Sequence, residues 1–291
     1  MKPGIHQISM SEYLALKALS SGLCHTLLTY SPYHAKWEQD NRPDDPSIES
    51  DIGTAIHEAL LEGRDRIVEI EADDWRSKAA REARDAVRAA GKIPMLARTA
   101  ALIEPAVSAA KAYIASSEIA GVLDAGKPEE TLIWQEGAVT CKARPDWLDT
   151  IRPLMLHVKT TGGSAEPNSW IRNQLVPSGY DVSMAFYERG FYQLMNGDNS
   201  FQLMNVFLVI EQQEPHGCSL IGLDPAMRDL AAKKADRAIR TWRECQLEGR
   251  WPCYPTRIAY AEPKSWQMEQ EEQATLIETY DRLQEKHGLQ P

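Results

Sequence analysis

Long apolar segments are missing from this chain. No run approaches the roughly 18 apolar residues that cross a bilayer, and no charged N-terminal region leads into an apolar stretch. We therefore expect a cytoplasmic protein with no membrane partner.

Paired cysteines are also missing. The chain has five cysteines and no C-x-x-C pair, so neither a zinc ribbon nor a disulfide framework is indicated. Their wide spacing is poor for an iron–sulfur cluster, and none is expected. We predict buried thiols instead, at Cys24, Cys141, Cys218, Cys245 and Cys253.

The chain lacks the excess of positive charge that nucleic-acid binding usually requires. It has 32 basic and 42 acidic side chains, a net charge of −10, and residues 258–291 contribute −4 of this. A nucleic-acid partner would therefore need a local basic groove and bound cations, and its binding would be strongly salt-sensitive. The candidate groove residues are Lys142, Arg144, Lys159, Arg172 and Arg189.

The hydropathy pattern predicts helices first and then a mixture of strands and helices. With 291 residues and 43% hydrophobic content the chain can bury a large core. We expect one α/β domain over residues 1–260, with its core at about 50–250, and an acidic C-terminal helix over 261–291. That helix could dock on its own domain or serve as an oligomer or partner contact. Helices are predicted at 20–38 with a break at Pro32, 72–90, 97–119, 178–195, 224–249 and 265–289, and strands at 129–134, 139–148, 154–159, 203–210 and 218–223.

Residues 144–161, RPDWLDTIRPLMLHVKTT, combine a Pro-Asp turn with a strand that ends in His-x-Lys. Hydrolysis of a phosphodiester needs a divalent cation, which carboxylates such as Asp146 hold. Side chains alternate along a strand, so His157 and Lys159 share one face while Val158 points into the core. On this segment alone, an ordinary turn and a solvated lysine remain an alternative interpretation.

Further motifs follow in a fixed order. They are DIGTAIHEALLEG at 51–63, EETLIW at 129–134, RPDWLD and HVKTT, and GYDVSMAFYERG at 179–190. With them the chain resembles the RecE/exonuclease VIII-like branch of the RecB-type PD-(D/E)xK nucleases over roughly 8–260. The resemblance implies a mixed central sheet flanked by helices, with a helical N-terminal section.

The resemblance also implies roles for single residues. His57, Asp146, the residue at 157 and the main-chain carbonyl of Val158 would hold Mg²⁺ or Mn²⁺, and Lys159 would be catalytic with help from Glu129 and Asp146. The Glu129-Glu130 doublet leaves the register of that glutamate open by one residue. Thr54 and Gly63 would begin and end the helix of His57. Residues expected to contact DNA are Arg144, Thr160, Tyr180, Ser183 and Tyr187.

Two positions depart from the family pattern. His157 stands where the family has Asp or Glu, and Ser183 stands where it has Gln. Imidazole suits Mn²⁺ better than Mg²⁺. His157 can therefore be a natural ligand that prefers manganese, a sign of lost turnover, or a mutated position.

The resemblance implies a metal-dependent exonuclease that degrades one strand of double-stranded DNA from an end, 5′ to 3′. It also implies a role in recombination by strand annealing in a bacterial or phage-infected cell, a homo-oligomeric ring and a single-strand annealing protein as partner. The alternatives are a DNA- or partner-binding protein with weakened or lost catalysis, and an endonuclease or nickase with the same core.

Overall fold

The computed structural model describes residues 1–41, 52–195 and 202–287. The chain forms two compact units, Met1–Cys253 and Tyr254–Pro291, so the second unit begins before the expected boundary after Tyr260. Within the described residues, no helix is both long enough and apolar enough to cross a membrane.

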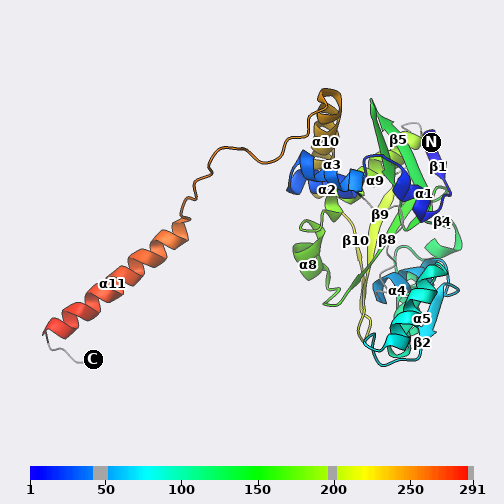
Figure 1. Cartoon of the computed structure of the whole chain (residues 1–291), viewed down its shortest axis with the longest axis horizontal. Helices are drawn as coiled ribbons and strands as arrows, with labels where there is room; N and C mark the ends of the chain where they lie inside the picture. Colours follow the sequence, from blue (N-terminus) through cyan, green and yellow to red (C-terminus); the bar gives the residue numbers. More distant parts are fainter. Residues whose placement is uncertain (42–51, 196–201, 288–291) are drawn as a thin grey trace. The chain divides into compact units, whose positions relative to one another are not determined.

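A five-stranded mixed sheet forms the centre of the first unit (Figure 1). Its order is β10 (Cys218–Ile221), β9 (Met204–Glu211), β8 (Leu154–Thr161), β7 (Trp147–Asp149) and β4 (Lys127–Pro128). Strands β8 and β9 are parallel, and the other neighbours are antiparallel. The predicted mixed sheet is therefore confirmed.

A second, three-stranded sheet joins β1 (Gly4–His6), β5 (Thr131–Glu136) and β6 (Val139–Ala143). The predicted single strand over 139–148 is wrong, because it divides into β6 and β7, which belong to different sheets. Pro145 explains the break, since it has no N–H for a ladder and restricts the backbone of Arg144. The break places the next residue, Asp146, at the entrance of β7.

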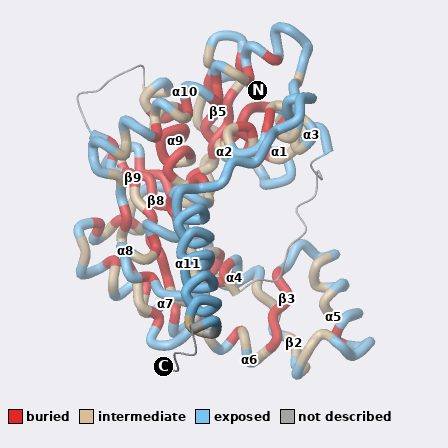
Figure 2. Tube along the Cα trace, turned by 90° about the vertical axis from the view of Figure 1, so that its left-hand side faces the viewer, coloured by how far each residue is buried: buried red, intermediate tan, exposed pale blue. Residues whose placement is uncertain are grey.

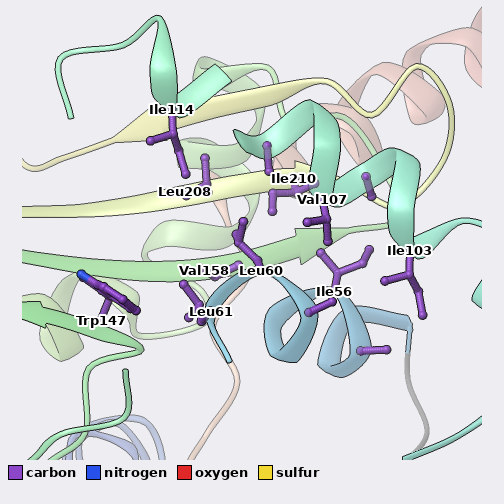
Figure 3. Close-up of a cluster of buried hydrophobic side chains, with 14 of the residues drawn as sticks. Ile56, Leu60, Leu61, Ile103, Val107, Ile114, Trp147, Val158, Leu208 and Ile210 are labelled. Atoms are coloured by element: carbon purple, nitrogen blue, oxygen red, sulfur yellow. The ribbon is translucent and has the colours of Figure 1, made fainter. Parts of the chain in front are cut away.

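Helices cover both faces of the central sheet. On one face α4 (Ile52–Leu61) and α7 (Ile103–Ala115) pack against β8 and β9 in a continuous apolar cluster (Figure 3). On the other lie α9 (Tyr180–Leu194), α2 (Ser21–Thr29) and α10 (Pro225–Glu248), whose clusters include Phe186 and Trp242. Asp224 caps α10 and Gly249 ends it with φ 63°, as the sequence predicted.

The remaining elements of the first unit are short. A small lobe consists of the parallel pair β2 (Ile67–Ile70) and β3 (Ile93–Leu96) with α5 (Lys78–Ala89) and α6 (Ala97–Ala100). Helix α5 begins later than predicted because the Ser77 hydroxyl accepts a hydrogen bond from the Ala80 N–H and caps it there. The others are α1 (Met10–Ala15), α3 (Pro32–Asn41), the 3₁₀ turn Val122–Asp124, and α8 (Pro167–Trp170), which continues as a π-helix over Ile171–Leu175.

The second unit contains the predicted C-terminal helix, α11 (Ser265–His287). Its large apolar side chains are exposed at Trp266, Met268, Leu276, Ile277, Tyr280 and Leu283. Its docking, on its own domain or on an oligomer or partner, stays a prediction.

Candidate metal centre and active site

Side chains from four separate elements meet where β7 and β8 lie side by side. His57 Nε2 lies 3.4 Å from Asp146 Oδ1 and 3.6 Å from Glu129 Oε1. Lys159 Nζ lies 3.9 Å from Asp146 Oδ2. Helix α4, the entrance of β5, the entrance of β7 and strand β8 each supply one of these groups. The structure therefore brings together the four residues that the motifs singled out.

Asp146 is held by the backbone of the neighbouring strand. The register of β7 on β8 pairs Trp147 with Leu156, and the Val158 N–H donates to Asp146 Oδ2 at 2.6 Å. Burial alone would raise the pKa of Asp146, but the charge of Lys159 and the hydrogen bond with His57 outweigh it and hold the pKa far below its usual range. This carboxylate is therefore ionised at neutral pH.

Glu129 approaches the same point from the other side. Its φ of 55° departs from strand geometry, and its N–H donates to the Asp146 carbonyl at 3.2 Å. Arg144 Nε donates to Glu129 Oε2 at 2.5 Å. Burial and the charge of Asp146 raise the pKa of Glu129, while Arg144 opposes the rise. Glu130 instead pairs with Lys127, so Glu129 is the residue of this doublet whose carboxylate lies beside His57.

His57 sits on the inner side of α4. Its neighbours Ile56 and Leu60 pack into the apolar cluster, which fixes the direction of the imidazole (Figure 3). Burial lowers the pKa of His57, but Asp146 and Glu129 outweigh it and leave the pKa raised. The predicted cap at Thr54 is wrong, because α4 already includes Ile52 and Thr54 is an exposed residue inside the helix.

One acidic residue of this group lies within the 51–63 motif but was assigned no role from the sequence. This residue is Glu62, just beyond α4. One carboxylate oxygen of Glu62, one of Glu129 and a ring nitrogen of His57 all lie within 4.8 Å of one another. The spacing of five residues after His57 matches no helical face and gives no signal of its own. Carboxylate oxygens with one imidazole are donors that suit Mn²⁺ or Mg²⁺, so the residues present fit a divalent cation.

His157 is buried on the α9 side of β8, with 5% of its surface exposed. Its Nε2–H donates to Asn205 Oδ1 at 3.0 Å, and Asn205 Nδ2 in turn donates to the Met184 carbonyl at 3.1 Å. Burial lowers the pKa of His157 to about 4, so the ring is neutral at pH 7. The role of His157 as a ligand stays a prediction, as does that of the Val158 carbonyl.

Tyr180, one of the residues expected to contact DNA, lies close to Lys159. Lys159 Nζ stands 5.5 Å from the ring centre of Tyr180, and Tyr187 packs edge-on against His157 at 5.2 Å. The Ser183 hydroxyl donates to that of Ser21 on α2 at 3.1 Å. Further along β8, the Thr160 hydroxyl accepts a hydrogen bond from Gln212. Their contact with DNA stays a prediction.

Several of the basic residues proposed for a groove are occupied by protein contacts. Lys142 is 2% exposed and donates to the carbonyls of Tyr13 and Leu16, so its place in a groove is wrong. Arg189 is held by Glu136 and Asp236. The Arg144 side chain is 9% exposed and pairs with Glu129. It also donates to the Ile8 carbonyl, which holds the guanidinium in place, so Arg144 positions Glu129. Lys142 and Arg189 have structural roles.

Comparison with known proteins places this geometry in a family. Residues 19–281 match the model described as "PDDEXK-like domain of unknown function (DUF3799)". The fold is similar to a crystal structure named "Putative exonuclease" from Eubacterium rectale, with a TM-score of 0.52 and 11% identity over 89% of this chain and 97% of that one. No curated protein matches the sequence. The RecE branch stays a prediction. Because the family model spans most of the chain and the predicted motif residues meet in one place, this protein belongs to the PDDEXK-like family.

Proposed function

We propose that this protein is a metal-dependent exodeoxyribonuclease that degrades one strand of double-stranded DNA from an end. The observation that carries the proposal is the meeting of Lys159 with Asp146, while His57 contacts both Asp146 and Glu129. Convergent carboxylate and imidazole ligands with a lysine beside them suit metal-assisted phosphodiester hydrolysis.

Four residues of the centre would hold the cation: His57, Glu62, Glu129 and Asp146. The family resemblance adds the residue at 157 and the Val158 carbonyl as further ligands. When bound, a divalent cation lowers the pKa of water and offsets negative charge on the phosphate. Arg144 orients Glu129, and the Val158 N–H orients Asp146. These contacts keep the carboxylates in place before substrate arrives, which reduces the reorganisation that the reaction needs.

Lys159 would act directly on the substrate. Burial disfavours its charge, but Asp146 outweighs this effect and raises the pKa of Lys159, so the ammonium stays protonated. Tyr180 lies against this ammonium and is itself stacked on Trp170. A fixed ammonium can donate hydrogen bonds to a phosphate oxygen and to the attacking water as negative charge develops.

The finer parts of the proposal rest on the family resemblance. They are 5′-to-3′ polarity, recombination by strand annealing, a ring-shaped homo-oligomer, a single-strand annealing partner and a cytoplasmic location. The metal is Mg²⁺ or Mn²⁺, and the neutral imidazole at position 157 favours Mn²⁺.

A cleavage assay with two DNA shapes and two metals tests the proposal. We expect mononucleotides from a linear duplex in Mn²⁺ and no product from a closed circle. Lys159→Ala should abolish release, whereas Lys233→Ala, which alters an exposed lysine paired with Asp229, should leave it unchanged. Cleavage of the circle would instead show an endonuclease or nickase, and an active Lys159→Ala variant would remove Lys159 from the mechanism.

A binding protein without turnover is the second candidate. The buried, neutral His157 favours it, because this residue replaces the acid of the family motif and donates to Asn205. Binding of the linear duplex without product in either metal would support this candidate and contradict the nuclease.

A further inference from the structure

Positive charge is concentrated in one short stretch of this acidic protein. Residues 76–98 contain seven basic and two acidic side chains, a net charge of +5, whereas the whole chain carries −10. The acids of the small lobe precede this stretch, with five of them between Asp65 and Asp74. The stretch covers α5, the following turn and β3.

Helix α5 presents its arginines on one flank. Arg81, Arg84 and Arg88 are spaced i, i+3 and i+7, which places them along one side of a helix. Ala80 is the buried residue of α5, and Arg81 and the following Lys92 are exposed. Figure 2 shows α5 beside β3 with much of its length exposed or half-buried. Arg81 and Lys92 are therefore open to a partner, whereas Arg84 and Arg88 are half-buried.

Local acids offset only part of this charge. Lys78 pairs with Glu82 within α5, and Arg84 pairs with Asp85. Among the described residues, no ion pair is formed by Arg81, Lys92 or Arg98 within 4.0 Å. An exposed cation without a neighbouring acid is available to a phosphate.

The basic lobe is joined rigidly to the candidate metal centre. Ile93 and Met95 of β3 belong to the same apolar cluster as Ile56 of α4, the residue next to His57. Helix α5 packs against β3 and β2, so β3 connects α5 to the helix that supplies His57. A polymer bound at the metal centre can therefore extend onto a basic surface of fixed position.

We propose that the α5 flank and the turn after it, Arg81, Arg84, Arg88 and Lys92, bind the sugar-phosphate backbone of DNA outside the metal centre. This inference rests on the proposed function, because it assumes DNA as the substrate. The evenly spaced charges of the backbone match a row of cations that follows a helix, and no base contact is needed. The surface also accounts for how a protein with a net charge of −10 can hold a polyanion.

Salt-dependent DNA affinity of the full chain tests this surface. Arg81→Gln with Lys92→Gln removes two exposed cations and leaves the buried face of α5 intact. The matched control is Arg237→Gln with Arg240→Gln on α10, which also removes two exposed cations. Both double substitutions are made in the Lys159→Ala variant. Binding of a fluorescent duplex in Mn²⁺ is then measured by fluorescence anisotropy between 50 and 300 mM salt.

We expect the α5 pair to reduce the slope of log affinity against log salt by about 1.8, since each phosphate contact contributes about 0.9. If the variant and the parent extrapolate to the same affinity at 1 M salt, the variant should bind about sixtyfold more weakly than the parent at 0.1 M salt. The α10 pair should match its parent. Equal slopes for both pairs and the parent would overturn the inference and leave the proposed function standing. If the Lys159→Ala chain binds no duplex at any salt, both fail.

Discussion

Replacing His157 with aspartate should raise Mg²⁺-dependent cleavage at least about tenfold, the range over which changes around a metal commonly act. The buried position lies on the same strand face as Lys159, and Asp146 and His157 affect each other's pKa. A carboxylate there adds a hard oxygen donor and a negative charge that neutral imidazole lacks. A tenfold gain corresponds to about 1.4 kcal/mol of transition-state stabilisation.

The same substitution should destabilise the metal-free protein. It removes the hydrogen bond to Asn205, worth about 1 kcal/mol, and buries a second carboxylate near Asp146. Lys159 offsets part of that charge, so we expect a loss of about 3 kcal/mol in the free energy of unfolding. Mg²⁺ should restore part of this loss, because a ligand that binds only the folded state stabilises it.

His157→Asn separates the charge from the change in shape. Asparagine has nearly the same volume as aspartate but no charge, so it should not raise the rate in Mg²⁺. The assay is release of mononucleotides from a linear duplex in Mg²⁺ and in Mn²⁺, with urea unfolding in EDTA beside it. If His157→Asp is no faster than the parent in Mg²⁺, position 157 is not the weak ligand and the reasoning fails.

Two further predictions concern stability away from the metal centre. Lys142→Met should lower the free energy of unfolding by about 3 kcal/mol, because it leaves two backbone carbonyls near α1 without their charged donor. Urea unfolding measures this, and Lys127→Met, at a 69% exposed lysine, should change it by less than about 0.5 kcal/mol. Burial would raise the pKa of Asp149, but hydrogen bonds from Arg152 and two backbone N–H groups outweigh it and lower the pKa. The stability that its carboxylate contributes is therefore present above the ordinary pKa of 3.8 and is lost as pH falls through the lower folded value. The difference between the parent and Asp149→Asn in urea unfolding should be constant from pH 7 to 5 and shrink below about pH 4; a difference that grows toward low pH would contradict this.

The meeting of His57, Asp146 and Lys159 could be predicted from the sequence because each belongs to a short motif with its own local geometry. Asp146 follows a proline that ends one strand, and Lys159 lies near the end of a buried strand. Those local constraints set where each side chain emerges. The resemblance then supplied the order in which the motifs come together.

Other features depend on contacts that no short pattern encodes. The buried position of Lys142 is defined by carbonyls more than a hundred positions earlier in the chain, and periodicity cannot show such a partner. Glu62 approaches His57 and Glu129 only because the chain turns after α4. The strand predicted over 139–148 was wrong because hydropathy continues through Pro145 although the ladder does not.

The distribution of charge along the chain also could not be interpreted without the fold. The net charge of −10 counted against nucleic acid, although the +5 stretch at 76–98 is visible in the sequence. Its meaning depends on the fold, because the shared apolar cluster ties this lobe to the helix of His57. Composition averaged over the whole chain therefore concealed a local surface.

Anomalous diffraction from crystals soaked in Mn²⁺ tests the central claim most directly. The account predicts a manganese peak within about 2.6 Å of both His57 and Asp146, with Glu62 or Glu129 among the other protein ligands and Lys159 beside them. A peak that forms elsewhere, or no peak at this centre under saturating Mn²⁺, would contradict the account.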